Sequence, residues 1–105
     1  MRQIDHHIVG GAGGSSRFSD VLDPNNGGVQ AQVALGDRAV LDRAVAAAKA
    51  AQPAWAATNP QRRARVMFEF KRLVEANMNQ LAEMLSAEHG KVIADSKGDI
   101  QRGLE

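Results

Sequence analysis

The sequence predicts a mixed α/β chain that is mainly α-helical, in which a β-hairpin is followed by about four helices. Three observations predict this class. Residues 29–35 alternate apolar and polar side chains, as a half-buried strand does. The segment Asp-Pro-Asn-Asn-Gly-Gly at 23–28 is typical of a chain reversal and separates them from a β-prone segment at 18–22. From Asp37 onward, apolar residues recur at helical spacing.

The amino-terminal region is predicted to be β structure. Residues 4–9 form a short β-prone segment, and the glycine-rich residues 10–16 predict a flexible turn or loop. Residues 18–22 and 29–35 then pair as the hairpin. The second strand is expected to present one apolar face, made of Val29, Ala31, Val33 and Leu35. Because an isolated hairpin is marginally stable in water, we expect this one to lie against another part of the protein.

Asp37 is a predicted N-cap of an alanine-rich helix that Pro53 should end, with Trp55 in the connection that follows. Asn59 and Pro60 then start a second helix, with a capping residue followed by proline at the first helical position. Its buried face is expected to consist of Val66, Met67, Phe70, Leu73 and Val74.

Residues 77–79 are predicted to interrupt the helical pattern. A third helix follows, carrying Leu81, Met84 and Leu85, and Gly90 is its predicted C-cap. A fourth, amphipathic helix should begin near Val92 and continue to the last residue.

The composition limits the function classes. With 44% hydrophobic but only 4% aromatic residues in 105, the chain can build only a thin core. A net charge of +1 argues against a dedicated nucleic-acid binder. The chain has no apolar run near the ~20 residues that a membrane span needs, and no secretory signal, so we expect a soluble, cytoplasmic protein. The absence of cysteine excludes a thiol nucleophile within these residues.

Three local features suggest a binding site for phosphate, nucleic acid or a metal, but each has a simpler explanation. The loop at 10–16 fails the dinucleotide-binding pattern, because Ser16 stands where glycine or alanine is required and no helix start follows. The basic cluster within residues 62–72 is typical of a solvated helix face. His6 and His7 are adjacent in a predicted strand, so they should point to opposite faces, which disfavours a shared metal.

The order of several motifs nevertheless resembles the start of the aldehyde dehydrogenase superfamily. These motifs are Asp23-Pro24 in the hairpin, the helix with Ala44-Val45-Ala46-Ala47-Ala48, Trp55, Pro60 followed by Arg63-Ala64, and Glu88-His89-Gly90-Lys91. The segments 62–70 and 98–105 look most like the CoA-acylating branch that acts on methylmalonate semialdehyde. The resemblance covers nearly the whole chain.

The resemblance implies an α/β subunit in which residues 1–36 are a β-hairpin region and residues 37–105 a helical region of the nucleotide-binding domain, with the catalytic domain outside this chain. It also implies assembly with the remainder of the subunit into a homodimer or homotetramer, with no nucleic acid and no membrane as partner. The implied reaction oxidises the semialdehyde with NAD and passes the acyl group from a cysteine to CoA, with loss of carbon dioxide. These residues alone should therefore be inactive.

The resemblance also assigns site residues. Arg102 matches an arginine thought to bind the substrate carboxylate, and a planar guanidinium can hold a carboxylate through two parallel hydrogen bonds. Glu88 and the backbone carbonyl of Leu22 match positions that hold a monovalent cation in some relatives. Without the resemblance, Arg102 would be interpreted as an exposed surface arginine, and for Glu88 a surface glutamate at a helix end is the preferred alternative.

Two alternative functions remain at this stage. The chain could be a free-standing helical interaction module without catalysis. A more remote possibility is nucleic-acid binding through the basic helix at 62–72, which the near-zero net charge disfavours.

Overall fold

The computed structural model describes residues 1–105, with Ala12 described only as part of a strand, and divides into two compact units. Unit 1 comprises residues 1–22 and 29–58, and unit 2 comprises residues 23–28 and 59–105. The predicted class, mixed α/β and mainly helical, is confirmed. The elements are β1 Arg2–Ile4, β2 His7–Ile8, β3 Gly11–Ala12, β4 Phe18–Leu22, β5 Val29–Ala34, α1 Arg38–Ala57, α2 Pro60–Ala76, α3 Met78–His89 and α4 Ile93–Leu104.

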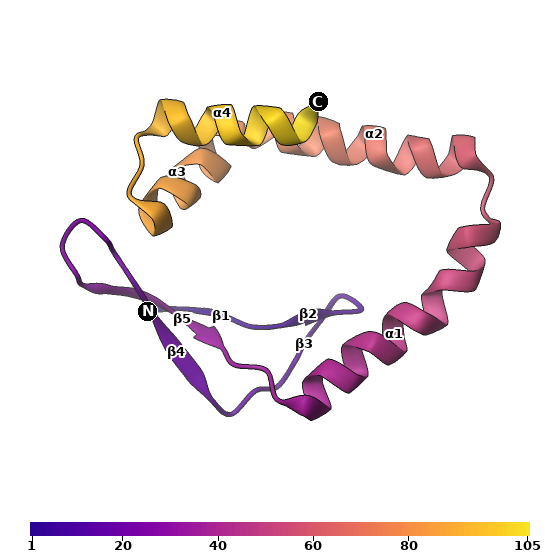
Figure 1. Ribbon diagram of the computed structural model, residues 1–105, viewed down its shortest axis with the longest axis horizontal. Helices are drawn as coiled ribbons and strands as arrows, with labels where there is room; N and C mark the ends of the chain where they lie inside the picture. The colour runs from indigo at the N-terminus through magenta and orange to yellow at the C-terminus, as the bar shows by residue number, and fades with distance from the viewer. The chain divides into compact units, whose positions relative to one another are not determined.

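Unit 1 is built on a three-stranded sheet in the order β1-β5-β4 (Figure 1). The predicted hairpin is present, since β4 and β5 are antiparallel from Phe18 opposite Ala34 to Leu22 opposite Val29. The third strand, β1, runs parallel to β5 on its other edge, with Arg2 opposite Ala31. This edge strand is what the hairpin lies against within unit 1.

The predicted single strand at 4–9 and the predicted loop at 10–16 are both wrong in part. Residues 2–4 and 7–8 form separate strands, and β2 pairs antiparallel with β3, His7 opposite Ala12. The turn between them holds Val9 at φ 52° and Gly10 at φ 74°. Two consecutive positive φ angles match the twist of a two-residue hairpin, and glycine permits this angle at position 10, whereas Val9 is a β-branched residue in a region that such residues rarely adopt.

The predicted alternation of β5 holds only partly. Ala31 is buried as expected, at 1% exposure, but Ala34, which was expected on the polar face, is also buried, at 7%. Leu35, expected on the apolar face, lies beyond the strand and is 38% exposed. The two buried alanines are an odd number of residues apart on the central strand of the sheet, so they lie on opposite faces.

Asp37 caps α1 as predicted, accepting a hydrogen bond from the Val40 N–H at 2.9 Å. The prediction that Pro53 ends this helix is wrong, because α1 continues to Ala57 and includes Trp55. The end is set instead at Thr58, whose hydroxyl donates to the Ala54 carbonyl at 2.8 Å. Alanine-rich sequence on both sides of Pro53 favours the helix strongly enough to keep it continuous.

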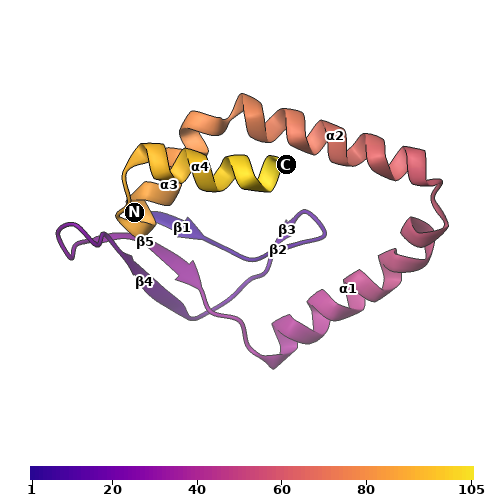
Figure 2. The same ribbon diagram turned by 45° about the horizontal axis from the view of Figure 1, so that its top comes forward.

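Unit 2 contains α2, α3 and α4. Asn59 caps α2, accepting from the Gln61 N–H at 2.8 Å, and Pro60 is the first helical residue, as predicted. Asn77 separates α2 from α3 and occupies the N-cap position of α3. In both ribbon views α4 runs back in the direction opposite to α2 (Figures 1 and 2).

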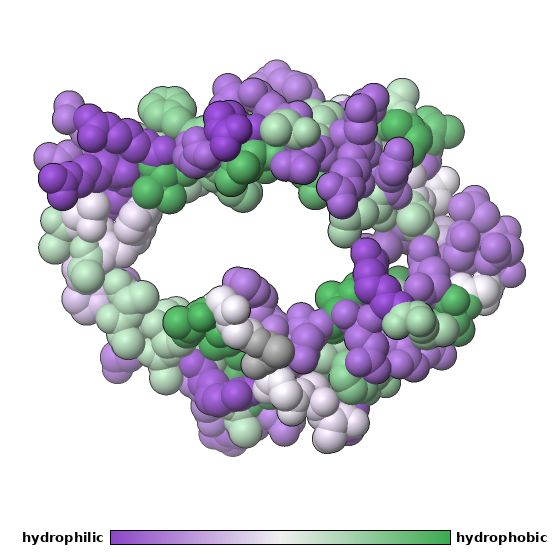
Figure 3. Space-filling model, turned by 180° about the vertical axis from the view of Figure 1, so that it is seen from behind, coloured by the Kyte–Doolittle hydropathy of each residue, from purple (hydrophilic) through white to green (hydrophobic). Residues whose placement is uncertain are grey.

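The expected burial of one face of α2 is wrong for the described chain. Val66, Met67, Phe70 and Leu73 are 54%, 58%, 60% and 46% exposed. In the space-filling view, hydrophobic residues, in green, are visible at the surface next to hydrophilic ones, in purple (Figure 3). The stripe is present with helical spacing, but the described residues of unit 2 do not cover it. None of the helices that the structure describes is both long and apolar enough to span a bilayer.

Candidate functional site

The predicted substrate-binding residue Arg102 lies in the last turn of α4, which is positioned by its packing on α3. Ala82 of α3 and Ser96 of α4 are both 0% exposed. The hydroxyls of Ser86 and Ser96 share a hydrogen bond of 2.7 Å across the two helices. Small side chains at the contact allow close approach, and the hydroxyl pair satisfies the polar groups that this approach buries.

The α3–α4 turn is closed by Gly90, which ends α3 at φ 90° as the predicted C-cap. Its N–H donates to the Ser86 carbonyl at 2.8 Å. A Cβ at this position would also lie 3.0 Å from Cγ of Pro24. Glycine is therefore favoured here both by the left-handed backbone and by the space available.

Lys91, the next residue along the turn, joins Arg102 through a shared carboxylate. Asp99 Oδ2 accepts a hydrogen bond from Lys91 Nζ, and Asp99 Oδ1 accepts one from Arg102 NH1 at 3.2 Å. Asp99 and Arg102 are three residues apart, so they lie on the same face of α4. We call Lys91, Asp99 and Arg102 the charged triad.

Exposure decreases from one end of the charged triad to the other. The side chain of Arg102 is 79% exposed, that of Asp99 34% and that of Lys91 22%. The hydrogen bond from Lys91 is the main reason why the pKa of Asp99 lies below its ordinary value, and the positive charge of Arg102 adds to the effect. Asp99 is thus ionised at neutral pH, and the triad carries a net positive charge at the solvent-exposed guanidinium.

This arrangement can bind a carboxylate. A guanidinium has several N–H donors, and the described structure engages Arg102 through NH1 to Asp99. The outward part of the group is available to an incoming anion. The sequence indicated Arg102 only through its family resemblance and missed Lys91 and Asp99. The three-residue spacing of Asp99 and Arg102 was the available signal, whereas the link to Lys91 requires the turn at Gly90.

The two predicted cation ligands are not brought together by any described contact. Glu88 lies exposed in the last turn of α3, within unit 2. Leu22 ends β4 in unit 1, and its carbonyl accepts a hydrogen bond from Gln30 Nε2 at 3.2 Å. The side chains that the structure describes contain no group of three or more His, Cys, Asp or Glu suited to a metal. The assignment of Glu88 and Leu22 stays a prediction.

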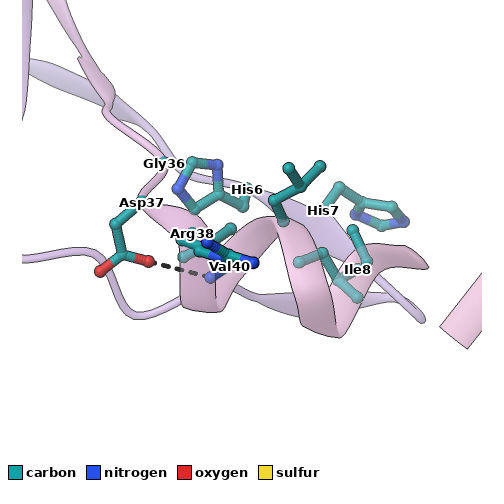
Figure 4. A pocket seen from close by; sticks show the side chains of 9 residues that line it. His6, His7, Ile8, Gly36, Asp37, Arg38 and Val40 are labelled. Atoms are coloured by element: carbon teal, nitrogen blue, oxygen red, sulfur yellow. Dashed lines mark hydrogen bonds between the residues drawn. The ribbon is translucent and has the colours of Figure 1, made fainter. Parts of the chain in front are cut away.

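Unit 1 contains a pocket beside the start of α1, lined by both adjacent histidines (Figure 4). The imidazole of His6 lies next to Gly36, whereas that of His7 points away from it. His6 Nε2 is buried and has no hydrogen-bond partner among the described residues. A Cβ on Gly13 would lie 2.5 Å from the His6 side chain, so the glycine makes room for the ring. The same pocket is lined by Asp37, whose carboxylate accepts the Val40 N–H, and no hydrogen bond joins it to His6 among the described residues.

Comparison with known proteins gives a consistent result. The model of the aldehyde dehydrogenase family matches residues 12–105. Malonate-semialdehyde dehydrogenase of Pseudomonas aeruginosa PAO1 is 39% identical over 102 residues, which are 95% of this chain and 20% of that protein. Malonate-semialdehyde dehydrogenase 1 of Bacillus licheniformis is 38% identical over 105 residues, covering all of this chain and 21% of that protein.

Among solved structures, one from Sinorhizobium meliloti 1021 is provisionally identified as a methylmalonate-semialdehyde dehydrogenase and is complexed with NAD. It superimposes with a TM-score of 0.93 at 58% sequence identity, over 99% of this chain and 22% of that one. The chain therefore spans about a fifth of the length of the proteins it matches.

Proposed function

The chain belongs to the aldehyde dehydrogenase family, and on that premise we propose that it forms the amino-terminal part of an NAD-dependent, CoA-acylating dehydrogenase of malonate or methylmalonate semialdehyde. The enzyme oxidises the semialdehyde to an acyl-CoA with loss of carbon dioxide. The similarity of almost the whole chain to relatives named for these semialdehydes carries this proposal.

Within this enzyme, Arg102 binds the carboxylate of the substrate. Malonate semialdehyde has a fixed negative charge at one end and the reacting aldehyde at the other. A charge-assisted bond to the guanidinium is worth about 1.5–3 kcal/mol, which is enough to favour the acidic substrate over a neutral aldehyde by tenfold or more. The exposed guanidinium and the net positive charge of the triad support this role.

The remaining chemistry belongs to other parts of the subunit. The sequence contains no cysteine, so the nucleophile is supplied from outside these residues. The glycine-rich segment at 10–16 does not have the form of a site for NAD or CoA phosphates. The glycine-rich segment forms the β2–β3 hairpin and its continuation, whereas a dinucleotide site needs a helix N-terminus at that point. NAD, when bound, accepts the hydride from the substrate.

We also propose the domain organisation and the assembly of this enzyme. Residues 1–36 and 37–105 are the β-hairpin region and a helical region of the nucleotide-binding domain, and the catalytic domain lies in the remainder of the subunit. The subunit assembles as a homodimer or homotetramer in the cytoplasm. Glu88 and Leu22 remain a weaker assignment for a monovalent cation within the same subunit.

The exposed face of α2 supports this proposal over a free-standing interaction module. Phe68 is 70% exposed and Phe70 60%, whereas the buried apolar residues among those described are alanines. A stripe of large apolar side chains without cover is expected of a segment that packs on the remainder of a subunit.

The test compares the full-length subunit with the 105-residue chain. We expect the full-length protein to reduce NAD with malonate semialdehyde and to release an acyl-CoA only when CoA is present, and the 105-residue chain to do neither. Absorbance at the NADH band and chromatography of the CoA products measure both. Turnover by the 105-residue chain alone, or formation of a free acid with no use of CoA by the full-length protein, would contradict the proposal.

A further inference from the structure

We propose that Lys91 is a positioning residue that keeps Arg102 available to the substrate, because it occupies and neutralises the carboxylate of Asp99. The inference rests on the proposed function, in which Arg102 binds the substrate carboxylate. It assigns a role in specificity to a residue that stands in the α3–α4 turn rather than on α4 itself.

The two carboxylate oxygens of Asp99 bind different partners. One oxygen takes Lys91 Nζ, and the other takes a single nitrogen of Arg102 at 3.2 Å. Asp99 therefore orients the guanidinium through one contact and leaves its outer edge unengaged by the described residues.

A second ion pair in the same unit, with glutamate in place of aspartate, offers a comparison in which the described contacts of the carboxylate are to arginine alone. Glu69 and Arg72 of α2 have the same three-residue spacing as Asp99 and Arg102. There the guanidinium is bound by both oxygens, with Nε to Oε2 at 3.0 Å and NH2 to Oε1 at 2.6 Å. Such a two-point pair consumes the same edge that a substrate carboxylate would use.

Lys91 also changes the net charge around Arg102. With Lys91 present, the charged triad is net positive, and the guanidinium faces solvent with its charge uncancelled. With Lys91 removed, Asp99 and Arg102 would form a neutral pair like the one on α2. The Lys91–Asp99 contact is also less exposed than the Glu69–Arg72 contact, at 22% and 34% against 57% and 62%, so solvent and salt weaken it less.

The test uses the full-length enzyme and two aldehydes of similar size, malonate semialdehyde and propionaldehyde. Lys91→Gln keeps a hydrogen-bond donor and removes the charge. We expect it to raise KM for malonate semialdehyde about tenfold, equivalent to about 1.4 kcal/mol, and to change KM for propionaldehyde less than about twofold. Lys91→Arg should stay close to the parent enzyme on both substrates.

The decisive variant is Lys91→Gln combined with Asp99→Asn, which removes the uncompensated carboxylate. We expect it to recover most of the lost affinity for malonate semialdehyde, to within about threefold of the parent. A role of Lys91 that is only structural would lower Tm and affect both aldehydes equally, with no recovery in the double variant. Either equal effects or absent recovery would overturn the proposal, and so would failure of both lysine variants to fold.

Arg102→Ala separates this inference from the function on which it rests. If Arg102→Ala impairs both aldehydes equally, the substrate assignment of Arg102 itself is wrong. If Arg102→Ala is selective for the acidic substrate but Lys91→Gln is not, the function stands and only the role of Lys91 is rejected.

Discussion

The α3–α4 pair and α2 are both amphipathic, but they differ in exposure: the contact between α3 and α4 is buried, whereas the apolar face of α2 is exposed. Where α3 meets α4, the contact residues are small, and Ala82 and Ser96 are fully buried. On α2 the corresponding stripe is large and open, with Met67 58% and Phe70 60% exposed. The difference separates a contact that the described residues complete from an apolar face that they leave open, and under the proposed function the remainder of the subunit covers that face. The charged triad belongs to the α3–α4 pair, whose contact is buried.

The largest effect should come from the open face. Phe70→Ala in the full-length subunit is expected to cost about 3–5 kcal/mol, because a covered phenylalanine loses its packing when truncated. The same change in the 105-residue chain should have almost no effect on stability, since the side chain is already exposed. Thermal and denaturant unfolding of both proteins measure this. Arg62→Ala, at an exposed position of the same helix, is the control. A negligible effect in the full-length protein would show that this face stays uncovered.

A larger side chain in the buried α3–α4 contact should destabilise the protein. Ala82→Leu places a larger side chain where the α3–α4 contact leaves no room, and we expect a loss of about 1–3 kcal/mol in the full-length subunit. Ala50→Leu, at an exposed position of α1, should change stability by less than about 0.5 kcal/mol. Equal tolerance at the two positions would mean that the α3–α4 contact is loosely packed.

The turn that carries Lys91 can be tested through its glycine. Gly90→Ala should cost about 1–2 kcal/mol, because a residue with a Cβ is strained at φ 90° and would press on Pro24. Gly98→Ala, in the interior of α4 with nothing near its added Cβ, should instead stabilise by about 0.5–1 kcal/mol. Opposite signs at two glycines of one region are the expected result, and the same sign at both would contradict the described turn.

The smallest effect should be the dependence on pH and salt. The pKa of Asp99 is lowered by Lys91 and that of Glu69 by Arg72, so each carboxylate stabilises the fold above its ordinary pKa and loses that contribution as pH falls through the lowered value. We expect the Tm difference between the parent and Asp99→Asn to be constant near neutral pH and to shrink below about pH 4. High salt should abolish the corresponding difference for Glu69→Gln and leave part of that for Asp99→Asn. Identical salt responses would show that the two pairs are equally exposed.

Local signals in the sequence predicted the four helices and three of their caps, whereas the end of α1 was wrong and the predicted interruption at 77–79 is limited to Asn77. The caps at Asp37, Asn59 and Gly90 depend on bonds within a few residues, which a sequence pattern records directly. The continuation of α1 past Pro53 was not predicted, because one unfavourable residue was weighed without the alanine-rich sequence around it. The hairpin at 18–34 was predicted because its turn is also local.

Features that depend on distant pairing were not predicted. The parallel contact of β1 with β5 joins residues about thirty positions apart, and no local pattern records it. For the same reason the sequence identified Arg102 by resemblance but not its partner Lys91, which reaches Asp99 only because the chain turns at Gly90. The exposure of α2 was missed because a helical pattern predicts which face is apolar but not which protein segment covers it.

The most direct test of the account measures kcat/KM of the full-length enzyme for malonate semialdehyde and for propionaldehyde, in the parent and in Arg102→Ala. Arg72→Ala, which removes an exposed arginine with the same ion-pair spacing, is the matched control. We expect Arg102→Ala to lower the preference for the acidic aldehyde by about tenfold to a hundredfold, and Arg72→Ala to leave it unchanged. An unchanged preference in Arg102→Ala would contradict the assignment of this guanidinium to the substrate carboxylate.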